Sequence, residues 1–210
     1  MFEIIPGILE KDWSEIEKKI ELVKHFVKTI HIDIIDGKFA ENVTFLDPKP
    51  FEKYTKDLLF EVHLMVDEPI NYLDSFANAG FKRFIGHIEH MSSQVEFIAK
   101  GELLGGVSLA LDVKTPLENL QVDYEDLDSI LIMSVKAGLS GQVFMPEVLT
   151  KVTKISDSFP IPVEIDGGIN DLTIIQAEKA GVKRFVTTNF LFSGNSLTNY
   201  QKLVSLTHES

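Results

Sequence analysis

Short apolar runs rich in Ile, Val, Leu and Phe recur roughly every 25 residues along the 210-residue chain. Eight such runs are predicted to be strands, at residues 3–9, 29–35, 59–65, 83–89, 105–111, 129–135, 161–167 and 184–190. Apolar residues between them have helical spacing, as in Ile16, Ile20, Val23 and Val27 behind Asp12, and Ile174, Ala177 and Ala180 behind Asp171. Buried strands that alternate with amphipathic helices indicate a parallel sheet covered by helices. Eight repeats favour a closed (β/α)8 TIM barrel of the α/β class over an open doubly wound sheet.

Glycines mark several of the expected turns from a helix to the next strand. Gly80, Gly105 with Gly106, and Gly181 follow helical stretches and precede strands, as expected for left-handed helix caps. The fifth unit is the least regular, because residues 115–128 offer only a short helix. No low-complexity tract or Pro- and Ser-rich linker divides the chain, so we expect a single barrel domain over residues 1–210.

The charge balance limits the partners that the chain can have. Its 20 basic and 32 acidic side chains give a formal net charge of -12, which repels nucleic acid and anionic membranes. An anionic substrate must therefore be held by local groups such as backbone amides and helix N-termini. The first residues lack a signal-peptide pattern, and no apolar run approaches the ~20 residues of a membrane span. We expect a cytoplasmic protein that binds neither nucleic acid nor membranes.

Four polar residues lie late in predicted strands, where a TIM barrel gathers its active site. His31 and Asp33 are two positions apart, so a strand directs both side chains to the same face. His63 lies near the end of the third strand and Asp166 near the end of the seventh. Each residue alone could be a hydrogen-bonded polar group of the core or a turn.

Together, these two imidazoles and two carboxylates form a complete N2O2 ligand set for one divalent metal ion. The absence of Cys excludes thiolate ligands and thiolate nucleophiles, so a metal site must use His and carboxylate. This ligand set suits zinc, iron(II), manganese and cobalt alike.

Two glycine-containing segments have the composition of substrate-binding loops. Gly167 and Gly168 stand between a strand and a helix, where free amides can hold a phosphate. Residues 133–142 follow the sixth strand and could fold over a ligand, or could form only a flexible connector.

Four segments of the chain form recognisable motifs: Ile30-His31-Ile32-Asp33 with Asp36-Gly37, Val62-His63-Leu64-Met65, Leu131-Ile132-Met133-Ser134-Val135, and Glu164-Ile165-Asp166-Gly167-Gly168-Ile169-Asn170. In this order they resemble the ribulose-phosphate 3-epimerase family. The resemblance runs from Pro6 to about Phe192 and includes residues 87–89 and 115–118.

The resemblance implies a metal-dependent, cytoplasmic homo-oligomer of the pentose phosphate pathway, an isomerase of carbohydrate metabolism. Its reaction would be epimerisation at C3 of a small phosphorylated sugar, D-ribulose 5-phosphate to D-xylulose 5-phosphate. The implied metal ligands are His31, Asp33, His63 and Asp166. Asp33 and Asp166 would also be the catalytic acid/base pair, acting through a metal-stabilised enediolate, and removal of a proton beside a ketone requires such groups. The implied substrate-binding residues are Gly7, His63, Met65, Met133, Gly138, Ser140, Gly141, Gly167, Gly168, Thr188 and Asn189.

Met65 and Met133 would cap the site with apolar surface that excludes water.

Other positions depart from the family pattern. The family usually has Ser where this chain has Gly7, and a Gly-Ser pair where it has Thr188 and Asn189; the loop at residues 136–142 also differs. We expect amides near Gly141, Gly168 and Asn189 to converge on the phosphate, beside a short helix that begins at Ser193-Gly194-Asn195. A Thr188 side chain directed at this anion site would shrink it, whereas one directed into the strand packing would leave its amide free.

Three alternatives remain open. One is a 3-epimerase of another ketose phosphate, such as allulose 6-phosphate. A second is a decarboxylase or aldolase of the wider phosphate-binding barrel group, but such decarboxylases need an Asp-x-Lys-x-x-Asp array, and Ile35 stands where the lysine would be. The third is a non-catalytic epimerase-like barrel, which would have no need of four convergent ligands.

Overall fold

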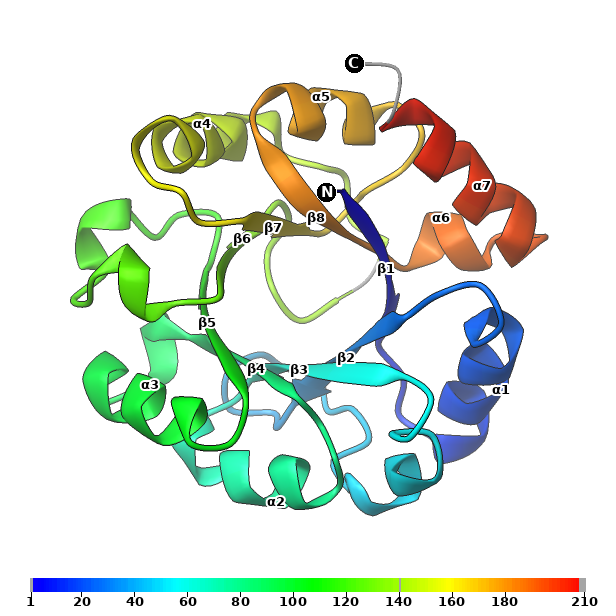
Figure 1. Cartoon of the computed structure of the whole chain (residues 1–210), viewed down its shortest axis with the longest axis horizontal. Helices are drawn as coiled ribbons and strands as arrows, with labels where there is room; N and C mark the ends of the chain where they lie inside the picture. Colours follow the sequence, from blue (N-terminus) through cyan, green and yellow to red (C-terminus); the bar gives the residue numbers. More distant parts are fainter. Residues whose placement is uncertain (1, 140, 208–210) are drawn as a thin grey trace.

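Eight parallel strands form a closed barrel in the computed structural model, which describes residues 2–139 and 141–207. Each strand pairs with the next along the chain, and the last strand closes the ring on the first (Figure 1). The strands are β1 (Glu3–Ile8), β2 (Thr29–Ile35), β3 (Leu59–Met65), β4 (Arg83–His87), β5 (Gly106–Leu111), β6 (Ser129–Met133), β7 (Val163–Asp166) and β8 (Val182–Thr187). The predicted (β/α)8 barrel is confirmed, and the open doubly wound sheet is excluded.

Helices surround this ring of strands (Figure 1). The α-helices are α1 (Trp13–Val23), α2 (Leu73–Asn78), α3 (Gln94–Glu102), α4 (Leu149–Ser158), α5 (Thr173–Lys179), α6 (Asn189–Phe192) and α7 (Ser196–Leu206). Short 3-10 turns are η1 (Lys49–Lys53), η2 (Pro69–Asn71), η3 (Ile88–His90), η4 (Leu117–Asn119), η5 (Tyr124–Asp126) and η6 (Pro146–Val148). Within the described residues, no helix is both long enough and apolar enough to cross a bilayer.

Several strands are shorter than their apolar runs suggested. The predicted strands 83–89 and 129–135 end at His87 and Met133, where the chain reaches the rim of the barrel. The strand predicted at 161–167 covers only Val163–Asp166, because Pro162 has no N–H for the ladder and Gly167 has a positive φ of 115°. The strand predicted at 184–190 is shifted to Val182–Thr187, since the chain turns into α6 at Asn189.

Two of the predicted glycine turns are confirmed and one is wrong. Gly80 and Gly181 have positive φ angles of 95° and 109°. Gly105 and Gly106 are not left-handed. Gly105 instead allows close packing, because a Cβ there would lie 2.4 Å from the carbonyl oxygen of Lys82. The fifth unit has only the 3-10 turns η4 and η5 in place of a helix, as its weak pattern indicated.

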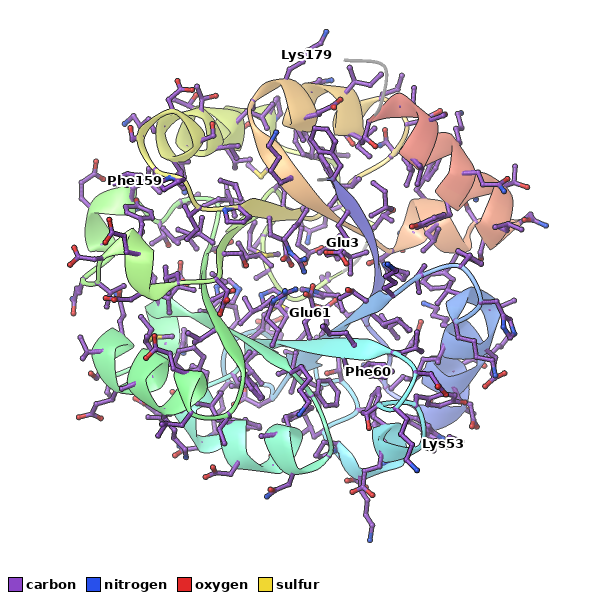
Figure 2. All side chains as sticks on the ribbon, in the orientation of Figure 1. Glu3, Lys53, Phe60, Glu61, Phe159 and Lys179 are labelled. Carbon is purple, nitrogen blue, oxygen red and sulfur yellow. The ribbon has the colours of Figure 1, made fainter. Side chains whose placement is uncertain are left out.

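The alternation of side chains along each strand creates two different interiors. Phe60 of β3 faces outward and packs against Phe51 and Phe81, with ring centroids 5.6 and 5.4 Å away. The next residue, Glu61, points into the centre of the barrel (Figure 2). The layer between strands and helices is thus apolar, whereas the barrel lumen carries the buried polar side chains from which the site is built.

Candidate active site

A cavity of about 610 Å³ opens at the C-terminal ends of the strands and extends over the loops that follow β6, β7 and β8. Ten of the predicted site residues line it: Asp33, Met65, Met133, Gly138, Gly141, Asp166, Gly167, Gly168, Thr188 and Asn189. Gly7, His31 and His63 are not part of this lining. Ser140 lies outside the described residues. None of the described lining residues is Lys or Arg, so an anion in the cavity has only neutral donors beside it.

His31, Asp33, His63 and Asp166 converge at the inner end of this cavity. One ligand atom from each residue lies within 4.8 Å of those of the other three, and all four residues are buried. The period of two along β2 brings His31 and Asp33 to the same face. The strand register sets Asp33 beside His63 on β3, and β7 contributes Asp166 from the other side of β1 and β8.

The donor set fits a divalent cation. Nδ1 of His31 is 2.8 Å from the Glu61 carboxylate, which directs Nε2 toward Asp33 at 3.3 Å. Nε2 is fully buried and has no hydrogen-bond partner in the part of the chain that the structure describes. A buried polar atom without a partner is costly, and a cation bound by the two His and two Asp residues would remove that cost.

His63 begins a chain of hydrogen-bond contacts that leads away from the site. Its Nδ1 is 2.9 Å from Oδ1 of Asp33, and its Nε2 is 2.9 Å from Nε2 of His87. Nδ1 of His87 is in turn 2.9 Å from Oε2 of Glu89. The other Glu89 oxygen accepts from the Asp112 amide at 2.7 Å. Sequence reasoning noted residues 87–89 only as part of the resemblance and assigned them no role.

The two site aspartates have opposite electrostatic surroundings. Burial and the charge of Asp33 raise the pKa of Asp166 to about 6, although nearby His31 and His63 act in the opposite direction. Burial alone would also raise the pKa of Asp33, but the adjoining His31 and His63 rings hold it well below its usual range. Two carboxylates at one site whose pKa values are driven apart can act as a base and an acid at the same pH.

A buried ion network lies beneath these residues. The Arg184 guanidinium contacts Glu3, Glu61 and Glu164, with its Nε 2.6 Å from Glu164, and Arg83 reaches Glu61 at 2.8 Å. The Glu61 carboxylate in turn contacts Nδ1 of His31, so the network supports a proposed metal ligand. The sequence analysis did not predict this network. The spacing could have indicated it, because Glu61 and Glu164 each precede a site residue by two positions in their strands and therefore share its face.

The loops after β6, β7 and β8 form the other end of the cavity. Among the described residues, the amides of Gly141, Gly168 and Thr188 donate to no protein acceptor. Gly168 has a φ of 64°, and a Cβ there would lie 2.8 Å from the amide nitrogen of Phe144. This close approach requires glycine.

Thr188 directs its side chain toward β1. Its Oγ1 lies 2.6 Å from the position that a Cβ on Gly7 would occupy.

The short helix expected to begin at Ser193-Gly194-Asn195 begins earlier, at Asn189, since the chain leaves β8 directly into α6. Asn195 instead caps α7 by accepting a hydrogen bond from the Thr198 amide.

Comparison of the sequence with known proteins places the chain in a family and finds similar enzymes. A family model described as "Ribulose-phosphate 3 epimerase family" matches residues 3–192. The chain is 35% identical over 201 residues to ribulose-phosphate 3-epimerase of Schizosaccharomyces pombe, covering 92% of this chain and 88% of that one. It is 31% identical over 204 residues to the Bacillus subtilis enzyme of the same name, covering 91% and 93%.

Solved structures share the fold at low sequence identity. A 3-keto-L-gulonate-6-phosphate decarboxylase from Vibrio cholerae gives a TM-score of 0.75 at 13% identity, covering 99% of this chain and 98% of that one. A 3-hexulose-6-phosphate synthase from Salmonella typhimurium gives a TM-score of 0.73 at 12% identity, covering 99% of each chain. At these identities the likeness concerns the barrel fold alone.

Proposed function

Because the chain belongs to the ribulose-phosphate 3-epimerase family, we propose that it interconverts D-ribulose 5-phosphate and D-xylulose 5-phosphate by epimerisation at C3. Membership of the family makes it an epimerase, an isomerase whose substrate class is a pentulose phosphate. The observation that carries the specific reaction is the meeting of Asp33 and Asp166 at one buried site, from strands that are not neighbours in the barrel.

The two carboxylates supply the acid and the base of the reaction. Asp33 is held ionised and takes the proton from C3, which lies beside the C2 ketone and is therefore acidic. The substrate then carries the charge of an enediolate. Asp166, whose pKa is raised to about 6, binds a proton more readily than Asp33 and, when protonated, delivers it to the opposite face of C3. The reverse reaction exchanges the two roles.

A divalent ion fits the same residues. His31, His63, Asp33 and Asp166 would hold it, and the unpartnered Nε2 of His31 supports this assignment. When bound, the ion would stabilise the negative charge that develops on the substrate oxygens. Zinc, iron(II), manganese and cobalt all accept two imidazoles and two carboxylates.

The remaining walls of the cavity orient the substrate and exclude water. Met65 and Met133 are buried and belong with Ile35 to an apolar cluster inside the barrel rim. A dry wall strengthens the electrostatic interactions at the reacting carbon. At the other end, the amides of Gly141, Gly168 and Thr188 would bind the phosphate as neutral donors, which suits a chain of net charge -12.

The proposed reaction can be tested by measuring the incorporation of deuterium from solvent at C3 of the sugar. The protein is incubated with D-ribulose 5-phosphate in D2O, after chelation and after return of each of the four metals. We expect xylulose 5-phosphate with deuterium at C3, loss of turnover on chelation, and recovery with at least one metal. Ketohexose phosphates assayed in parallel identify the preferred ketose, and light scattering tests whether the protein is a homo-oligomer. An absence of C3 exchange with every ketose phosphate would rule out the proposed reaction.

A further inference from the structure

We infer that Glu89 is a positioning residue which, acting through His87, fixes the ring nitrogen of His63 that carries the proton and so keeps Nδ1 of His63 available to a cation. Neither Glu89 nor His87 lines the active-site cavity. The inference rests on the metal site of the proposed function and adds to it the groups that prepare one of its ligands.

The first step is set by the Glu89 carboxylate. One of its oxygens accepts the Asp112 amide at 2.7 Å and the other faces Nδ1 of His87 at 2.9 Å. Burial alone would raise the pKa of Glu89, yet the hydrogen bond with His87 and other local interactions lower it to about 2. An ionised carboxylate can only accept, so Nδ1 of His87 must carry a proton.

The second step passes through the His87 ring. His87 is fully buried, and its Nδ1 proton is the one that the Glu89 carboxylate accepts. A neutral ring with its proton on Nδ1 has a lone pair on Nε2. That lone pair faces Nε2 of His63 at 2.9 Å, while the ring centroids are 4.9 Å apart and the planes differ by 25°. The short contact therefore joins the two Nε2 atoms, and Nε2 of His63 must be the donor.

The third step determines the chemistry at the site. With its one ring proton on Nε2, His63 has a lone pair on Nδ1. This lone pair points at Oδ1 of Asp33, 2.9 Å away, with Oδ2 of Asp166 at 3.7 Å. A nitrogen lone pair and two carboxylates that face one another repel unless a positive charge lies between them. The hydrogen-bond chain thus keeps this position suited to a cation.

Replacing Glu89 by Gln should exchange donor and acceptor in two hydrogen bonds, the one between residue 89 and His87 and the one between His87 and His63. The Asp112 amide donates and therefore holds the carbonyl oxygen of the new side chain. The NH2 group then faces His87, whose Nδ1 must accept, so Nε2 of His87 donates to His63. The proton of His63 moves to Nδ1 and is donated to Asp33. A metal ion must now displace that proton before it can bind.

The experiment measures Zn²⁺ affinity of the full chain by chelator competition, beside the urea stability of the chelator-treated protein. We expect Glu89→Gln to weaken Zn²⁺ binding about 10- to 100-fold without lowering the stability of the metal-free protein. Glu118→Gln is the matched control, because Glu118 is an exposed neighbour of Glu89 that contacts no histidine. It removes the same charge and should keep wild-type affinity.

Histidine ¹⁵N NMR of metal-free Glu89→Gln protein reads the proton position directly, and we expect it on Nδ1 of His63. A proton that remains on Nε2 would overturn the inference, as would wild-type Zn²⁺ affinity. Equal losses of Zn²⁺ affinity and metal-free stability would also overturn it, since they indicate a merely structural role. A wild-type protein that binds no Zn²⁺, Co²⁺, Mn²⁺ or Fe²⁺ would instead remove the metal site of the proposed function, and this inference with it.

Discussion

Asp166→Asn should make the metal-free protein more stable while it removes turnover. Burial and the Asp33 charge raise the pKa of Asp166 from an ordinary 3.8 to about 6, so its ionised form is disfavoured in the folded state. A shift of roughly two pKa units corresponds to about 3 kcal/mol of unfolding free energy. Asn has nearly the shape of the protonated acid and carries no charge, so the variant avoids this cost.

The predicted gain depends on pH with a definite sign. Because the folded-state pKa is raised, the contribution of Asp166 to stability is fully present below about pH 3.8 and is lost as the pH rises through about 6. Asp33 stays ionised across this window, since its pKa is held low. The variant should therefore nearly match wild type at about pH 3, exceed it by about 1 kcal/mol at about pH 4.5 and by about 3 kcal/mol at about pH 8.

Urea unfolding of chelator-treated wild type and Asp166→Asn at several pH values measures this difference. Saturating Zn²⁺ should then reverse the order, because the intact ligand set binds the ion more tightly and gains more stability. A variant that is less stable than wild type at about pH 8 without metal would refute the reasoning. A gain that does not shrink toward acidic pH would do the same.

Three further outcomes are expected. Asp33→Asn should keep a wild-type circular dichroism spectrum and lose about 10²- to 10⁴-fold in kcat, because an amide cannot accept the C3 proton; near-wild-type turnover would reject the two-carboxylate mechanism. Thr188→Gly should leave the preference for phosphorylated over unphosphorylated ketoses intact in KM comparisons, since the side chain is directed at β1; equal use of both classes by wild type would remove phosphate from the proposed function. Arg184→Met should lose about 3–5 kcal/mol in urea unfolding, because Glu61 and Glu164 would remain buried without the guanidinium; a loss below about 1 kcal/mol would show that they find other partners.

The sequence sufficed for the barrel and for the four converging residues because both depend on local periodicity. Apolar runs identify strands, the period of two puts His31 and Asp33 on one face, and a closed parallel barrel brings the ends of all strands to one rim. Asp166 and His63 could be assigned to the same site without knowledge of their side-chain contacts.

Other features depend on which strands face one another across the lumen, and the sequence does not contain that information locally. Glu61 and Glu164 come from strands far apart in the ring, and only the closed barrel brings both to Arg184. The link from His63 to His87 likewise needs the orientation of both rings. The ends of β4 and β6 follow from where the chain crosses the rim, although apolar residues continue beyond them.

The close approach of Thr188 to Gly7 limits which residues the first strand can hold at position 7. A Cβ at position 7 would lie 2.6 Å from Oγ1 of Thr188 and 2.7 Å from Cγ1 of Val186, so a side chain at position 7 requires both neighbours to shift. This chain therefore carries one hydroxyl at the end of β8, on Thr188, and none at position 7 of β1. Any hydroxyl introduced at position 7 would have to displace the side chains that now fill this corner of the barrel mouth.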